Sequence, residues 1–179
     1  TGGHNTAVGV NALFHQNGRS GQTAVGSGCF YTAPNLANSA GLGYQAGYSV
    51  TSGDELTLIG YQAGFDGDMD GDDNVILGNQ AAANATSLVR NVIIGHNAAK
   101  DSTITGRQNV IIGTSGSAKL TSGRDNVVLG SNAAPLITTN DNNILIGSSS
   151  TATQSACVGH SASFESVGIT STRYLPWAA

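Results

Sequence analysis

Short runs of aliphatic residues that end in glycine recur along almost the whole chain, as at residues 6–9 and 92–95. Successive glycines lie seventeen or eighteen positions apart, and only the last step, from Gly147 to Gly159, is shorter. Runs of β-branched residues are typical of strands, and a period of this length suits one coil of a solenoid rather than a helical hairpin. The pattern therefore predicts an all-β fold, a β-solenoid of about ten coils. The glycines are Gly9, Gly26, Gly43, Gly60, Gly78, Gly95, Gly113, Gly130, Gly147 and Gly159.

Other positions of the repeat keep the same register as the glycine. A small residue follows three positions later, as in Ala63 and Ala98, and an amide often follows two positions later, as in Gln62. The glycine predicts either a positive φ or close approach of a second backbone, and the small residue predicts tight packing. Asparagine recurs four positions before the glycine, where stacked amides can cap turns and form ladders between coils. These asparagines are Asn5, Asn74, Asn91, Asn109, Asn126 and Asn143.

The strands of the middle coils are apolar at every position, as at residues 92–94, 110–112 and 144–146. Alternate residues of a strand face opposite sides, so a strand of this kind is apolar on both faces. One face fills the coil, and the other face needs a second apolar surface. We therefore predict a homo-oligomer, a parallel homotrimer about one axis. The alternative is a monomer whose apolar strip is covered by its own loops.

Composition excludes several classes of function. Only 10% of the residues are charged, the net charge is -4, and the seven Lys and Arg residues are scattered, so no nucleic acid partner is expected. No run of about 18 apolar residues predicts membrane insertion. Cys29 and Cys157 lie about eight coils apart, which excludes an intrachain disulfide, and Cys29 occupies the small-residue position as a buried filler.

Two segments carry a resemblance to known repeats: residues 5–13, Asn-Thr-Ala-Val-Gly-Val-Asn-Ala-Leu, and residues 60–64, Gly-Tyr-Gln-Ala-Gly. They resemble the Gly- and Asn-rich repeats of phage tail fibres and are similar to repeats in the heads of trimeric autotransporter adhesins. The resemblance covers about residues 3–163. It implies parallel trimers that serve as rigid shafts or receptor-contacting heads, and the length of the repeat fits the fibre type better.

The resulting expectation is a structural and receptor-binding segment of a trimeric fibre, most simply a phage tail fibre that attaches to a host surface. The partners would be two further copies and a host cell-surface receptor or glycan, and the location a virion or the cell surface. Three alternatives remain open: an adhesin head, a glycan-cleaving tailspike, and an ice-binding solenoid. The last needs a regular threonine face, which Thr6, Thr23 and Thr57 begin but valine replaces from the fifth coil.

The repeats divide the chain into a solenoid, residues 1–163, and a C-terminal cap or tip segment, residues 164–179. In the tip segment, Tyr174 and Trp177 are candidate anchoring or contact residues. No G-x-S-x-G, H-E-x-x-H or phosphate-loop motif is present, so an enzyme is not expected.

An acidic loop, residues 66–74, is a candidate calcium site because its alternate carboxylates begin as a calcium loop does. The twelfth residue of that loop is Leu77 rather than glutamate, and the alternative is a solvated acidic loop. No other cofactor is expected. The candidate ligands are Asp66, Asp68, Asp70 and Asp72.

Aromatic residues of adjacent coils fall at matching offsets from the glycine. Tyr44 and Tyr61 follow it by one residue, and Tyr48 and Phe65 follow it by five. Two stacked ladders on one edge are therefore predicted, which would form a patch for a sugar or a protein, or else ordinary packing between coils. Phe14, Phe30, Tyr31 and Phe164 are interpreted as local plugs.

Overall fold

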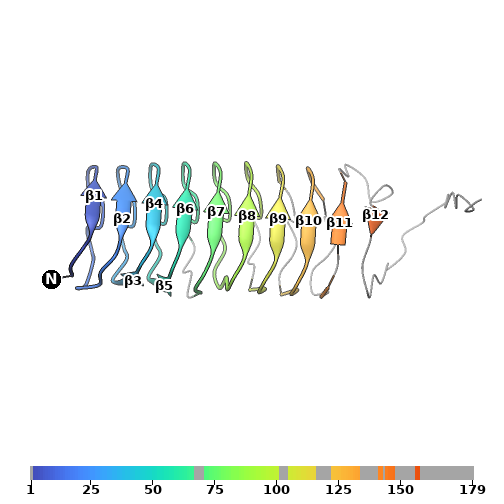
Figure 1. Cartoon of the computed structure of the whole chain (residues 1–179). Coiled ribbons are helices and arrows are strands. Elements are labelled where there is room, and N and C mark those ends of the chain that lie inside the picture. Colours follow the sequence, from blue (N-terminus) through green and yellow to red (C-terminus); the bar gives the residue numbers. More distant parts are fainter. Residues whose placement is uncertain are drawn as a thin grey trace, which may run out of the picture.

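The computed structural model describes residues 2–66, 71–100, 105–115, 122–133, 141–142, 144–147 and 156–157. The chain is a parallel β-solenoid with coils of about 17 residues, so the predicted fold class is confirmed. The coils stack in chain order into a rod, and each contributes one strand to a sheet that runs along it (Figure 1).

The long sheet contains ten strands in the order β1-β2-β4-β6-β7-β8-β9-β10-β11-β12. Neighbouring strands from β1 to β11 are parallel, and residues at the same repeat position pair, as Ala7 does with Ala24 and Val92 with Val110. Like residues therefore meet like along the rod. The strands are β1 (Thr6–Val8), β2 (Thr23–Val25), β4 (Ala40–Leu42), β6 (Thr57–Ile59), β7 (Val75–Leu77), β8 (Val92–Ile94), β9 (Val110–Ile112), β10 (Val127–Leu129), β11 (Ile144–Ile146) and β12 (Ala156–Cys157).

The last strand corrects the expected number of coils. The shorter run ending at Gly159 was predicted to form the last of about ten coils, but β12 pairs antiparallel with β11, Leu145 opposite Cys157. The step from Gly147 to Gly159 is too short for one complete coil, so the chain meets β11 in the opposite direction.

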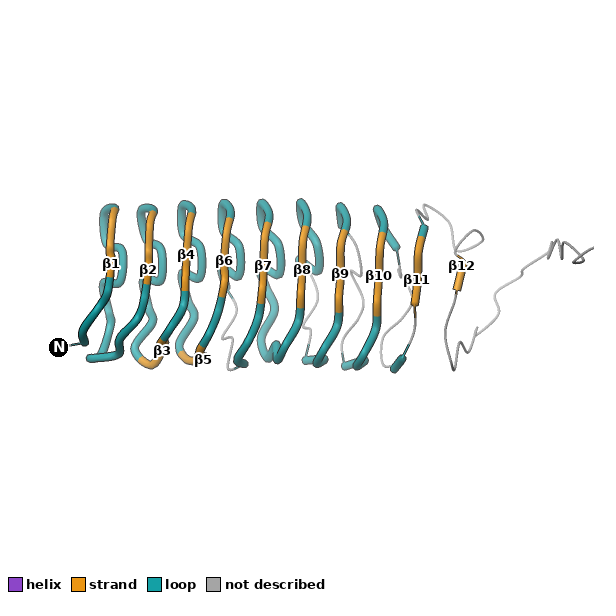
Figure 2. The backbone as a smooth tube through the Cα atoms, viewed as in Figure 1, coloured by secondary structure: helices purple, strands orange, loops and turns teal. Residues whose placement is uncertain are grey.

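A second, two-stranded sheet forms at one corner of the second to fourth coils. It pairs β3 (Asn35–Ala37) with β5 (Ser52–Asp54) in parallel. Loops connect these short strands to the long sheet, and most of each coil outside the strands is loop (Figure 2). This sheet was not predicted, because its short and mostly polar strands carry no apolar pattern.

The core fills the inside of the coils, and where one position carries a small residue, a large side chain at another position fills the space. The middle residue of the long-sheet strands from β2 to β11 is buried; it is Leu or Ile in β6–β9 but Ala24 in β2 and Gly41 in β4. Phe30 occupies the space left there, since a Cβ built on Gly41 would lie 2.7 Å from its ring. Phe30 is fully buried, which confirms its predicted role as a plug.

The repeat glycine shows both features predicted for it, a positive φ and the close approach of a second backbone. From Gly9 to Gly147 its φ lies between +132° and +150°, a region that residues with a side chain rarely adopt. A Cβ on Gly78 would also lie 2.3 Å from the carbonyl oxygen of Gly95 in the next coil. Backbone therefore packs directly on backbone at this corner.

A buried amide ladder runs through the middle coils, as the asparagine column predicted. The side-chain oxygen of Asn91 accepts hydrogen bonds from the backbone N–H of Asn109, at 2.9 Å, and from its amide, at 3.1 Å. The side-chain oxygen of Asn74 accepts the same two bonds from Asn91, and that of Asn109 accepts them from Asn126. All four side chains are fully buried, so the ladder satisfies polar groups that water does not reach.

Each coil turns at further corners where non-glycine residues also have positive φ. One corner directly precedes the asparagine position, as at Glu55, Asp73, Arg90 and Gln108. Glu55 follows Tyr48 by seven residues, whereas Asp73 follows Phe65 by eight. The extra residue of a longer coil therefore lies in this segment, and the other repeat positions keep their register.

Candidate binding surfaces

The outward face of the long sheet is an aliphatic strip, which we define as the first and third residues of β7–β11. These residues are exposed or half-buried, with Ile112 38% and Ile146 50% exposed. In the first coils the same face is less aliphatic, because Thr6, Thr23 and Ala40 occupy the first position, while Val8 and Leu42 are exposed at the third. The strip consists of Val75, Leu77, Val92, Ile94, Val110, Ile112, Val127, Leu129, Ile144 and Ile146.

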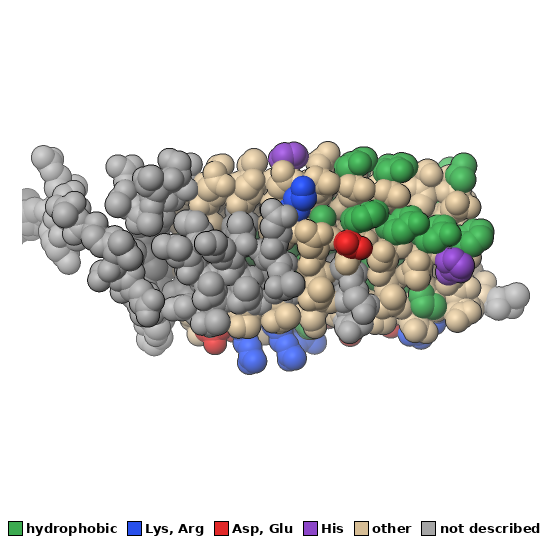
Figure 3. Space-filling model, turned by 180° about the vertical axis from the view of Figure 1, so that it is seen from behind, with side chains coloured by type: hydrophobic (Ala, Val, Ile, Leu, Met, Phe, Trp, Pro, Cys, Tyr) green, Lys and Arg blue, Asp and Glu red, His purple; other side chains and the backbone are tan. Residues whose placement is uncertain are grey.

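Two rows of stacked aromatic rings lie on the opposite side of the rod (Figure 3). Tyr44 and Tyr61 form one row, with ring centroids 5.6 Å apart. Tyr48 and Phe65 stack at 5.4 Å in the other row, so both predicted ladders are confirmed. The Tyr44 and Tyr61 side chains are 50% and 47% exposed.

The second row is twice as long as predicted. Phe14 stacks on Tyr31 at 5.3 Å, and Tyr31 stacks on Tyr48 at 4.8 Å. The interpretation of Phe14 and Tyr31 as local plugs was therefore wrong. Both residues follow the repeat glycine by five positions, the offset already noted for Tyr48, so the signal was present in the sequence.

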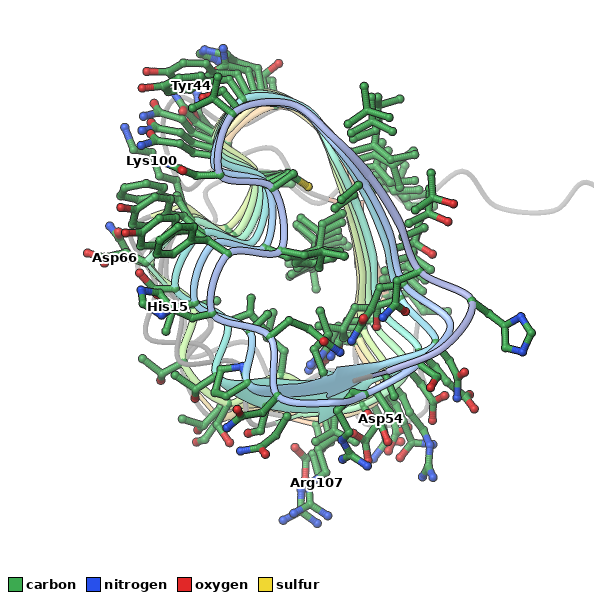
Figure 4. The ribbon with its side chains drawn as sticks, turned by 90° about the vertical axis from the view of Figure 1, so that its left-hand side faces the viewer. His15, Tyr44, Asp54, Asp66, Lys100 and Arg107 are labelled. Carbon is green, nitrogen blue, oxygen red and sulfur yellow. The ribbon has the colours of Figure 1, made fainter. Side chains whose placement is uncertain are left out.

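A ladder of amide side chains lies between the two rows. The Gln62 amide donates to the Gln45 carbonyl oxygen at 3.0 Å, and the Gln80 amide donates to that of Gln62 at 2.9 Å. The Lys100 ammonium ends the chain by donating to the Gln80 carbonyl oxygen at 2.9 Å. In cross-section, Tyr44, Lys100, Asp66 and His15 follow one another down one side of the coil (Figure 4).

We call this surface the aromatic–amide face. It comprises the two aromatic rows, the glutamines between them and Lys100. The amide position was recognised in the sequence, but its place between the rings was not predicted. The residues are Phe14, Tyr31, Tyr44, Gln45, Tyr48, Tyr61, Gln62, Phe65, Gln80 and Lys100.

An open hollow of about 580 Å³ lies at the end of the longer row. Phe14 and His15 meet there edge to face, with ring centroids 4.7 Å apart, and Phe14 is 57% exposed. Amide and hydroxyl groups line much of the rest of the hollow, so it offers an exposed ring beside hydrogen-bonding groups. The remaining lining residues are Gln16, Asn17, Thr32 and Pro34.

The predicted calcium loop is only partly described, because Asp68 and Asp70 lie outside the described residues. Asp66 lies beside the aromatic rows, whereas the Asp72 carboxylate accepts a hydrogen bond from the Asp54 backbone N–H at another corner of the coil. Among the described residues, no group of three acidic, histidine or cysteine side chains is placed to hold a metal ion. Calcium binding therefore stays a prediction.

Acidic residues of adjacent coils do meet at the corner that precedes the asparagine position. Glu55 and Asp73 stack there, and the side-chain hydrogen bond with Asp73 and its negative charge raise the pKa of Glu55. The Asp73 carboxylate also lies 3.4 Å from the Arg90 guanidinium, in an exposed ion pair. Like charges in adjacent coils oppose the stacking at this corner.

A raised pKa predicts how Glu55 affects stability. The folded state holds this proton more tightly than the unfolded state, whose pKa is near 4.5. The stabilisation is therefore complete below about pH 4.5 and is lost as the pH rises through the folded pKa. We expect Glu55→Gln to raise the melting temperature at pH 7 and to flatten its fall just above pH 4.5.

Thermal unfolding followed by circular dichroism from pH 3 to pH 8 tests this expectation. Asp125→Asn at the equivalent corner is the matched control, because its backbone φ is +56°, close to the +62° of Glu55. An identical pH profile for wild type and Glu55→Gln would contradict the role given to the Glu55–Asp73 contact.

The structure supports no functional role for the remaining residues singled out in the sequence. Cys29 is buried and unpaired, and burial raises the pKa of its thiol to about 12, so it is no nucleophile at neutral pH. Tyr174 and Trp177 lie outside the described residues, as does residue range 164–179 as a whole. In the described part of the chain, no helix has the length and apolar character needed to cross a membrane.

Comparison with known proteins adds no identification: no family model, no curated protein and no solved structure matches the chain.

Proposed function

We propose that this chain is a structural and receptor-binding segment of a trimeric fibre, with a phage tail fibre as the simplest parent. The observation that carries the proposal is the aliphatic strip. Its side chains extend over five consecutive strands and point away from the core, and no described loop buries them fully.

An uncovered strip of this kind favours self-association. Burying one aliphatic side chain contributes about 1.5–3 kcal/mol. The ten residues of the strip are already partly covered by their neighbours, so each contributes less, but their sum is large. A second copy in parallel register presents the same strip, and identical coils then meet along the whole length. The threefold symmetry itself comes from the resemblance to fibre repeats.

The arrangement of the two surfaces supports recognition by the same segment. The strands face one side of the rod, and the aromatic rows lie on the other side (Figures 1 and 3). In an assembly formed through the strip, the aromatic–amide face points outward on every copy. Three equivalent faces would then allow multivalent attachment.

Sedimentation equilibrium tests the assembly. We expect three chain masses for the wild type and a shift to one chain mass for Ile112→Glu, which places a charge in the centre of the strip. Val10→Glu is the matched control: Val10 is 71% exposed in the column of Tyr44, away from the strip, and its substitution should leave the mass unchanged.

A monomeric wild type would overturn the fibre proposal. A dimer would support self-association through the strip but overturn the threefold symmetry.

A further inference from the structure

We infer that the aromatic–amide face binds a neutral, linear glycan that lies parallel to the rod axis. This inference rests on the proposed receptor-binding function and names the class of receptor and its site. Three features carry it: the periodicity of the face, its hydrogen-bonding groups and its low charge.

The face repeats the same groups once per coil along the rod. The ring centroids of successive coils are 4.8 to 5.6 Å apart in the two rows. This step is close to the length of one sugar ring, so an extended glycan meets equivalent groups in each coil. An extended peptide repeats every two residues, at roughly 6.6–6.8 Å, and loses register within a few coils.

The amide ladder leaves donors for a ligand. Each glutamine amide has two N–H groups, and the ladder uses one of them in Gln62 and in Gln80. All the bonds run in one direction from the Lys100 ammonium, which polarises the chain and strengthens each remaining donor. Tyrosine hydroxyls flank the ladder on both sides, as donors and acceptors. Vicinal sugar hydroxyls match this set of groups.

Charge on the face is sparse, which favours a neutral ligand. Lys100 is the cation on this side of the described coils, and Asp66 lies beside it (Figure 4). The arginines of the described coils occupy other parts of the rod, such as Arg107 at the corner opposite Tyr44 (Figure 4). An acidic glycan would meet a carboxylate and a single ammonium, with no row of cations to bind it.

The rings contribute differently along the rows. Inside a row, each ring face is covered by its neighbour, with interplanar angles from 2° to 28° in the longer row, so edges and hydroxyls are exposed. At the end of that row, Phe14 stacks on Tyr31 on one side only. Its exposed ring adjoins the hollow lined by Gln16, Asn17 and Thr32. The rows therefore offer a ligand mainly ring edges and hydroxyl groups.

Isothermal titration calorimetry and saturation-transfer NMR test the inference on the intact chain. The probes are three neutral hexasaccharides, cellohexaose, laminarihexaose and maltohexaose, with an oligosialic acid as the acidic probe. We expect saturable binding of at least one neutral hexasaccharide and at least tenfold weaker binding of the acidic probe. Binding should weaken at least fivefold in Gln62→Ala and in the double variant Tyr44→Phe, Tyr61→Phe, which keeps the stacked rings and removes their hydroxyls.

Arg107→Ala is the matched control, because Arg107 is exposed at a different corner of the rod and its loss should not affect binding. Circular dichroism of each variant separates loss of binding from loss of folding. The inference is overturned if no neutral hexasaccharide binds, if the acidic probe binds best, or if the Gln62 and tyrosine variants bind as the wild type does.

The same samples distinguish this failure from failure of the fibre proposal. A trimer that binds no probe overturns the glycan site alone. A monomer that binds a neutral hexasaccharide overturns the fibre and leaves the site in place.

Discussion

Gly78→Ala is expected to destabilise the rod by more than about 4 kcal/mol, or to prevent folding, because two independent costs fall on one atom. The φ of Gly78 is +136°, which a residue with a Cβ rarely adopts. The added Cβ would also lie 2.3 Å from the Gly95 carbonyl oxygen and 2.7 Å from its carbonyl carbon. Those atoms are backbone of the next coil, so no side chain can rotate to relieve the contact.

The coil on the other side is affected as well. Gly60 packs on Gly78 in the same way, with its own built Cβ 2.4 Å from the Gly78 carbonyl oxygen. Any shift of residue 78 that relieves the clash with Gly95 therefore disturbs the contact with Gly60. In a stacked fold each coil depends on its neighbours, so the damage spreads along the rod.

Chemical denaturation followed by circular dichroism measures the effect. Gly3→Ala is the matched control, because a Cβ on Gly3 would meet no atom within 4 Å; we expect a change of at most about 0.5 kcal/mol there. If Gly78→Ala unfolded at the same denaturant concentration as the wild type, the backbone-on-backbone contact would have to be abandoned.

Asn91→Leu is the second large effect, expected to cost about 3–5 kcal/mol even though leucine adds apolar volume. The Asn91 amide donates to the Gly106 carbonyl oxygen at 3.0 Å, and its carbonyl accepts from the Asn109 backbone N–H at 2.9 Å. Both bonds are buried. Removing the amide leaves a donor and an acceptor without partners, and each such group costs about 1–3 kcal/mol.

Hydrogen exchange gives this prediction a local readout. The Asn109 backbone N–H should exchange much faster in Asn91→Leu, while amides of distant coils such as Thr23 change little. Asn84→Leu is the control, because Asn84 is exposed and its substitution leaves the buried ladder intact. Unchanged protection of Asn109 in Asn91→Leu would mean that the ladder does not hold this N–H.

The repeat made the stacking predictable from sequence. A residue type that recurs at one offset must occupy one type of environment, so the glycine, asparagine and small-residue columns each indicated a contact with the next coil. The inward and outward faces of the strands followed from simple alternation. These features were confirmed because the same local signal was repeated many times.

Features without a recurring residue type were missed. The corner that precedes the asparagine position has positive φ at Glu55, Asp73 and Arg90, residues with no shared preference for that conformation. Hydrogen bonds between coils set it instead: the Glu55 N–H donates to the Ala37 carbonyl at 3.1 Å, and the Arg90 N–H donates to the Asp72 carbonyl at 3.0 Å. Such bonds between coils override local propensity.

The aromatic–amide face was predicted only in part for a similar reason. Tyr44 and Tyr61 were recognised because identical rings recur at one offset, whereas Phe14 and Tyr31 were judged one at a time. The glutamine ladder was visible as a column, but its position between the two aromatic rows depends on the path of the coil in cross-section. Which side chains of one coil lie side by side depends on the fold, and the sequence pattern does not contain this information.

The placement of the extra residue in the longer coils bears on how such rods can diversify. Both longer coils take their additional residue in the segment that follows the Phe65 or Lys100 position and precedes the next corner, and the strands on either side of each longer coil stay paired in register. Both longer coils therefore accommodate extra length at the same point of the coil. A foreign peptide or an epitope inserted there would be displayed at a fixed height along a rigid shaft, and several insertions would be spaced by whole numbers of coils.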